Sequence, residues 1–244
     1  MFTDHFENEL RKYTIALLLA VAIFIGLSEY ISLRRGYYDL YIANKAFAGT
    51  AAVMLGVVFL IGPLSRLFDF ADRSLELRKH FGVIAMWSAL AHVVSSFFFL
   101  PGKFPFEQFF TKGITTTFFG LIATVGLLFV FIISRHSIMT WLTPRRWWPM
   151  QYWGLRIIFL FTALHVFVMK WDGWITWYKR GGGPELVYPE WPGGGLLVGW
   201  FMVFVLLMRI GELFGRRIGR LVWYFTLIGL PAVYYFTFIL GGKL

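Results

Sequence analysis

Seven runs of apolar residues, each long enough to cross a lipid bilayer, constrain this chain more than any other feature. A helix needs about 20 predominantly apolar residues to span a membrane. Of the 244 residues, 58% are hydrophobic and 15% are charged, which leaves too few polar side chains to cover a soluble protein of this length. The seven predicted spans are Tyr13–Leu33, Ile42–Leu67, His80–Leu100, Ile114–Ser134, Gln151–Trp171, Leu196–Leu213 and Leu221–Leu240.

The runs predict an all-α fold, a polytopic membrane helix bundle that forms one integral-membrane domain over residues 1–244. Helices satisfy their backbone hydrogen bonds internally, which the lipid interior requires. The first run follows an acidic tail rather than a positively charged segment, so we interpret it as a retained helix and not as a signal peptide. Membrane lipid is the expected surrounding of this surface.

Basic residues concentrate between the apolar runs and predict an orientation. The net charge is +10, but the lysines and arginines lie in short loops, where they indicate topology and lipid contact rather than nucleic-acid binding. Thirteen of them fall on the N-terminal side of the predicted topology and nine on the opposite side. This bias favours a cytoplasmic N-terminus and, after seven spans, an outside C-terminus.

Several kinds of chemistry are excluded by what the chain lacks. It has no cysteine, which rules out disulfides, thiolate metal sites and iron–sulfur clusters. The sequence contains no HExxH and no GxSxG motif and no cluster of carboxylates within the spans, so it shows no metalloprotease or serine hydrolase signature.

Two histidines, His92 and His165, lie deep inside the third and fifth predicted spans. An ionisable residue at that depth is costly and is a functional candidate by default. The two spans run in the same direction, so we expect the two imidazoles at similar depth. Two histidines alone make a poor zinc site, whereas a haem iron needs only two axial ligands. A haem-free transporter or channel remains the alternative, since Gly211, Gly215 and Gly219, at spacing four around the link between the last two spans, also suit close helix packing.

The third to fifth spans also resemble a known family. The stretches RKHFGVIAMWSALAH, Arg78 to His92, and RRWWPMQYWGLRIIFLFTALH, Arg145 to His165, are similar to the third helix and to the loop and fifth helix of the ferric-reductase-like transmembrane family. Within it the similarity is closest to the haem-binding membrane subunit of the bacterial methionine sulfoxide reductase system. The resemblance covers residues 44–170, and implies a six-helix ferric-reductase-like core with one additional helix.

The resemblance implies haem b between His92 and His165, the two axial ligands of the iron. His80 matches an inner-haem histidine of many members, but the position expected for its partner is near Tyr152 and holds no histidine. One haem is therefore expected. A second haem is an open alternative, and so is a flavin or quinone that faces His80.

The function implied is electron transfer across the bilayer, as an oxidoreductase subunit in a bacterial inner membrane. No segment after the sixth span is long enough to hold flavin and NAD(P)H. The expected donor is therefore quinol or a separate flavin reductase, and the expected acceptor an outer-face redox protein or ferric iron.

The segment from Trp171 to Gly195 is expected to be an outer loop. It is polar, aromatic and rich in glycine. Trp174, Trp177 and Trp191 are expected either to lie on the lipid headgroups, as tryptophan does at membrane interfaces, or to form a lid or docking surface over the site beneath.

Overall fold

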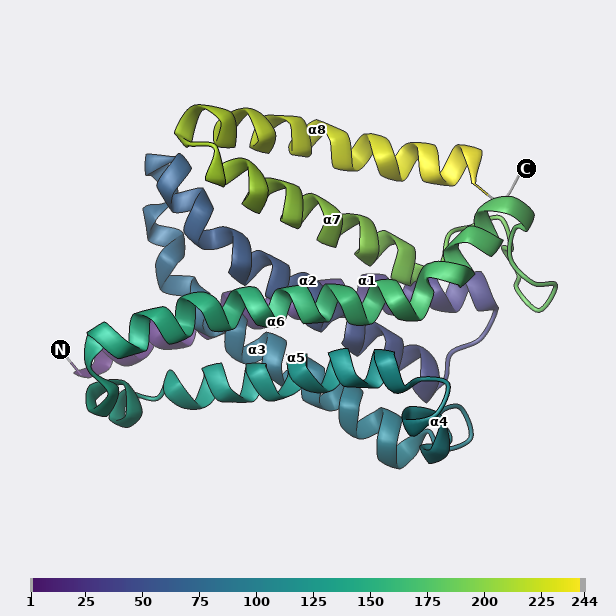
Figure 1. Cartoon of the computed structure of the whole chain (residues 1–244), viewed down its shortest axis with the longest axis horizontal. Helices are drawn as coiled ribbons and strands as arrows, with labels where there is room; N and C mark the ends of the chain where they lie inside the picture. Colours follow the sequence, from purple (N-terminus) through teal and green to yellow (C-terminus); the bar gives the residue numbers. More distant parts are fainter. Residues whose placement is uncertain (1, 242–244) are drawn as a thin grey trace.

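The chain folds into long helices that lie side by side along one axis (Figure 1). The computed structural model describes residues 2–241, except for the side chains of residues 2–5, 73 and 136. Within that range it contains helices and no strand, which confirms the predicted all-α fold. The elements are α1 (Phe2–Arg35), α2 (Leu40–Leu67), η1 (Asp69–Leu77), α3 (Arg78–Val94), η2 (Ser95–Phe99), α4 (Phe106–Phe110), α5 (Ile114–Ile133), α6 (His136–Arg180), α7 (Gly194–Leu213) and α8 (Arg216–Leu240).

Seven helical segments of the described chain are long and apolar enough to cross a membrane, in agreement with the seven predicted spans. They are Phe6–Arg35, Leu40–Leu67, Asp69–Phe99, Ile114–Ile133, Ser137–Arg180, Gly194–Leu213 and Arg216–Leu240. These helices indicate an integral membrane protein.

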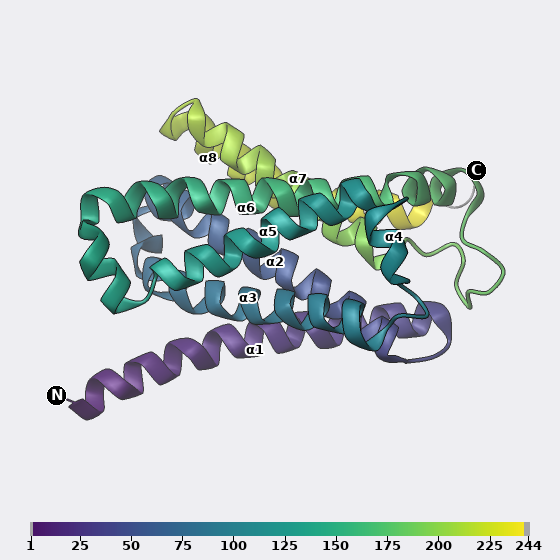
Figure 2. The ribbon, with the colours of Figure 1, turned by 60° about the horizontal axis from the view of Figure 1, so that its bottom comes forward.

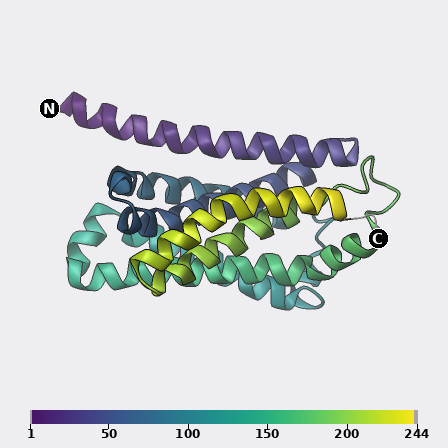
Figure 3. The same ribbon diagram turned by 90° about the horizontal axis from the view of Figure 1, so that it is seen from above.

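Helix α2 is the centre of the bundle. It packs against α1, α3, α6 and α7, and Figures 2 and 3 show α1 along one side and α7 and α8 along another. The rings of Phe59 and Phe159 stack at 4.9 Å between α2 and α6, and Met54, Leu55 and Ile158 are almost fully buried beside them. Burial of large apolar side chains from both helices fixes the position of α6 against α2.

Helix α6 is broken near its start. Thr143 has φ 59° and ψ 151°, outside the helical region, so a short first segment meets a long second one at a sharp angle (Figure 2). Pro144 follows directly and disfavours helical geometry at the residue before it. The long segment then continues to Arg180, nine residues beyond the predicted end of the fifth span. The stretch from Trp171 to Arg180 is therefore helix, and the expectation of a loop there was wrong.

Candidate functional site

His92 points from α3 toward α2, where it meets a buried asparagine. Its Nδ1 lies 2.8 Å from Oδ1 of Asn44, and Nδ2 of Asn44 donates to Oγ of Ser96 at 2.9 Å. Because the amide of Asn44 donates to Ser96, its oxygen accepts, and Nδ1 of His92 carries the proton. Asn44 is 1% exposed, so this chain of hydrogen bonds is shielded from competing solvent.

His165 has an equivalent arrangement on the opposite side. Its Nδ1 lies 2.8 Å from the backbone oxygen of Thr116 on α5, and a carbonyl oxygen only accepts, so Nδ1 again carries the proton. Gly120 allows this approach, because a Cβ at that position would lie 2.8 Å from Nδ1 of His165.

The two histidines are thus in the same chemical state. Each donates from Nδ1 to an oxygen of a neighbouring helix, and neither Nε2 has a hydrogen-bond partner among the described residues. A protonated Nδ1 held by an acceptor fixes the ring and leaves Nε2 with its lone pair free, which is the arrangement typical of metal-ligating histidine.

The helices that carry the pair face one another diagonally. Both α3 and α6 pack against α2 and α5, but the backbones of α3 and α6 make at most marginal contact with each other. Across that diagonal the imidazoles of His92 and His165 are near enough to interact electrostatically. Both side chains are only half-buried, so part of each remains accessible to a ligand.

The donor set fits a haem better than a bare metal ion. In the described part of the chain, no three histidine, aspartate or glutamate side chains come together as metal ligands, whereas a structural or catalytic zinc ion takes at least three. Two neutral imidazoles on diagonal helices suit the axial positions of an iron porphyrin.

Cations lie on one side of the pair, toward the ends of α1 and α6. Lys170 interacts electrostatically with both His92 and His165, and Lys45 and Arg35 interact with Lys170. Charged residues this far inside a membrane protein face its interior and have a partner. The carboxylates of a haem would provide such a partner. The sequence pattern alone did not single out Lys170.

His80 is placed differently. It is 2% exposed, its Nδ1 lies 3.1 Å from the backbone oxygen of Glu76, and its Nε2 lies 3.2 Å from the carboxylate of Glu9 on α1. Both ring nitrogens are therefore engaged by protein. The ring of Tyr152 packs on the guanidinium of Arg156, 3.3 Å from the ring centre.

The segment from Gly181 to Gly193 closes the end of the bundle beyond Lys170. The three tryptophans expected on lipid headgroups contact protein: Trp174 packs on Phe167, the 6%-exposed Trp177 donates to the backbone oxygen of Pro189, and Trp191 stacks on Tyr30. Trp177 is buried by these contacts, whereas Trp174 and Trp191 stay half-buried, so headgroup contact of these two remains a prediction. Arg34 fastens the segment to α1, because its Nε donates to the backbone oxygen of Trp191 at 2.8 Å.

Comparison with models of protein families and with curated proteins finds no match to this chain. The function is therefore argued from the residues and their geometry.

Proposed function

We propose that this chain is a membrane electron-transfer protein that holds one haem b between His92 and His165. The observation that carries the proposal is the matched state of the two imidazoles. Each is anchored through Nδ1, by Asn44 in one case and by the Thr116 carbonyl in the other, and each keeps Nε2 free on a helix that faces the other across the bundle. Two structurally unrelated anchors that produce the same tautomer favour a shared ligand.

The protein's own residues would define the properties of the site. His92 and His165 would fill both axial positions and so favour outer-sphere electron transfer over oxygen binding. Lys170 and Lys45 would pair with the propionate carboxylates at the outer end. Bound there, the haem iron supplies a one-electron carrier, and the apolar side chains of α2 and α6 keep its surroundings dry.

The direction of electron flow follows from the proposed orientation. With the N-terminus cytoplasmic, the histidine pair lies nearer the outer face than the inner one. We propose quinol or a separate flavin reductase as the donor, and an outer-face redox protein or ferric iron as the acceptor. The resemblance to the ferric-reductase-like transmembrane family is consistent with this direction of electron transfer.

The ligand assignment is tested by spectroscopy. We expect the purified protein to show a reduced-minus-oxidised b-type spectrum, and a pyridine haemochrome assay to give about one haem per chain, the number that two axial ligands can hold. His92→Ala and His165→Ala should each abolish the bis-histidine spectrum, because the iron loses an axial ligand.

His80→Gln is the matched control, since it changes a buried histidine of α3 that has no free ring nitrogen. It should leave the spectrum unchanged. A b-type spectrum that survives in both alanine variants would refute the assignment. A colourless wild-type protein would instead favour the haem-free transporter or channel.

A further inference from the structure

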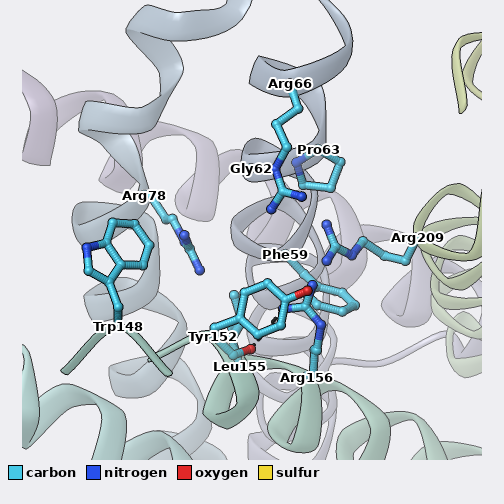
Figure 4. A pocket seen from close by; sticks show the side chains of 10 residues that line it. All are labelled: Phe59, Gly62, Pro63, Arg66, Arg78, Trp148, Tyr152, Leu155, Arg156 and Arg209. Carbon is cyan, nitrogen blue, oxygen red and sulfur yellow. Dashed lines mark hydrogen bonds between the residues drawn. The ribbon is translucent and has the colours of Figure 1, made fainter. Parts of the chain in front are cut away.

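Four arginines from four different elements converge at the end of the bundle opposite the lysines. Arg66 comes from the end of α2, Arg78 from the start of α3, Arg156 from α6 and Arg209 from α7, and all four line one cavity. In Figure 4 their guanidinium groups approach the same space from different sides. Phe59, Leu155 and Trp148 form its apolar wall.

Their positive charge is only partly balanced. In the described chain one carboxylate pairs with this group: Glu212 forms ion pairs with Arg66 at 2.9 Å and with Arg209 at 2.7 Å. Among the side chains that the structure describes, Arg78 has no acidic partner, and it interacts electrostatically with two of the other arginines, Arg66 and Arg156. Like charges this close repel one another, and at the edge of a membrane water screens them poorly.

The hydrogen-bond donors are also incompletely used. The side chain of Arg209 is 10% exposed, yet its Nε has no hydrogen-bond partner in the part of the chain that the structure describes. A buried guanidinium donor without an acceptor is costly. The pocket therefore combines excess positive charge, an unused buried donor and a cavity between the arginines. Together these features indicate a site for an anion that the protein itself does not supply.

Phosphate is the anion that suits this set best. Guanidinium groups bind it through paired N–H donors, and several arginines can share its oxygens. The cavity lies where α2 and α7 end and α3 begins, and basic pockets between membrane helices at the cytoplasmic side bind phospholipid headgroups. We propose that this arginine pocket binds a phosphate group, provided either by an anionic phospholipid of the inner leaflet or by a soluble phosphate. The proposal is independent of the haem.

The test measures thermal unfolding of the full chain in neutral detergent, with phosphatidylglycerol in one arm, inorganic phosphate in another and zwitterionic phosphatidylcholine as the reference. Phosphatidylglycerol or inorganic phosphate should stabilise the wild type beyond phosphatidylcholine. Arg78→Gln should weaken that effect by about tenfold in concentration, because one charged hydrogen-bond partner of the phosphate is lost. Without added anion, Arg78→Gln should unfold at a temperature no lower than the wild type, because repulsion has been relieved.

Lys79→Gln is the matched control, since it removes a positive charge from the next residue of α3, which is exposed and does not line the cavity. It should respond like the wild type, and Arg78→Lys should fall between. Stabilisation by the lipid alone would identify a headgroup as the source, and stabilisation by inorganic phosphate would identify a soluble one. No stabilisation of the wild type by either anion, or an equal response of Arg78→Gln and the wild type, would overturn the proposal.

Discussion

At the scale of single residues, the two proposed ligands differ in how they are anchored. His165 donates to a backbone carbonyl, which no substitution removes, whereas His92 donates to the side chain of Asn44. The anchor of His92 can therefore be deleted without touching either imidazole. The contribution of Asn44, which orients His92, can therefore be measured separately from that of the histidines.

We predict that Asn44→Ala weakens haem binding by about 10- to 100-fold, the range typical for loss of a group that orients a metal-ligating histidine. The redox midpoint potential of the remaining bound haem should rise, because His92 becomes a weaker donor to the iron. Titration of the apoprotein with haem and a potentiometric titration measure the two effects. Ser96→Ala, which removes the acceptor of the Asn44 amide but leaves its contact with His92, should have a smaller effect. If Asn44→Ala left the haem affinity and the midpoint potential unchanged, Asn44 would have no role in orienting His92 for haem binding.

Depth inside an apolar run was enough to select His92 and His165 as candidates, because that depth can be read from the sequence and an ionisable group there is costly. The anchors were less visible. Asn44 is a polar amide near the start of an apolar run, a detectable signal, but Thr116 contributes only its backbone. Arg66, Arg78 and Arg209 count as topology signals in the sequence, and their convergence with Arg156 could not be predicted because it depends on four elements meeting in space.

At the scale of elements, the seven spans could be predicted and their ends could not. The length of an apolar run indicates how much of a helix lies in lipid. It does not indicate where the helix ends, because a helix can continue beyond the lipid where neighbouring segments of the protein contact its polar residues. Beyond Trp171, Trp174 of α6 packs closely against Gly199 of α7, and Trp177 against Gly241 after α8, which are contacts with segments distant in the sequence. The break at the other end of α6 has a local cause in Pro144, but the positive φ of Thr143 has no such sequence signal.

The backbone conformation of Thr143 gives a testable prediction at the scale of elements. At φ 59° and ψ 151°, it occupies a region that is essentially restricted to glycine and costs about 1–3 kcal/mol for other residues. Thr143→Gly should therefore stabilise the protein by about 1 kcal/mol, after the greater freedom of glycine in the unfolded chain is subtracted. The midpoint of thermal unfolding in detergent measures the change. Thr14→Gly, at an exposed position inside α1, should instead destabilise by about 0.3 kcal/mol, the difference between the helix propensities of threonine and glycine. A loss of stability in both variants would contradict strain at Thr143.

At the scale of the whole molecule, an odd number of spans separates two chemically different ends. The described chain begins at one end of the bundle and α8 finishes at the other (Figure 1). The arginine pocket lies at the end where α7 turns into α8, and the lysines near the histidine pair lie at the opposite end. Which leaflet each end meets depends on the orientation of the chain.

We predict that the end of α8 is outside and that the turn between α7 and α8 is cytoplasmic, as the distribution of basic residues favours. Alkaline phosphatase, which is active only outside the cytoplasm, should therefore be active when fused after Gly241 and inactive when fused after Gly215. Green fluorescent protein should give the opposite pattern at both sites. The reverse result would place the arginine pocket at the outer face. Electrons would then have to enter the bundle at the end that holds Lys170, so the proposed route from an inner donor to an outer acceptor would fail even if the haem were bound.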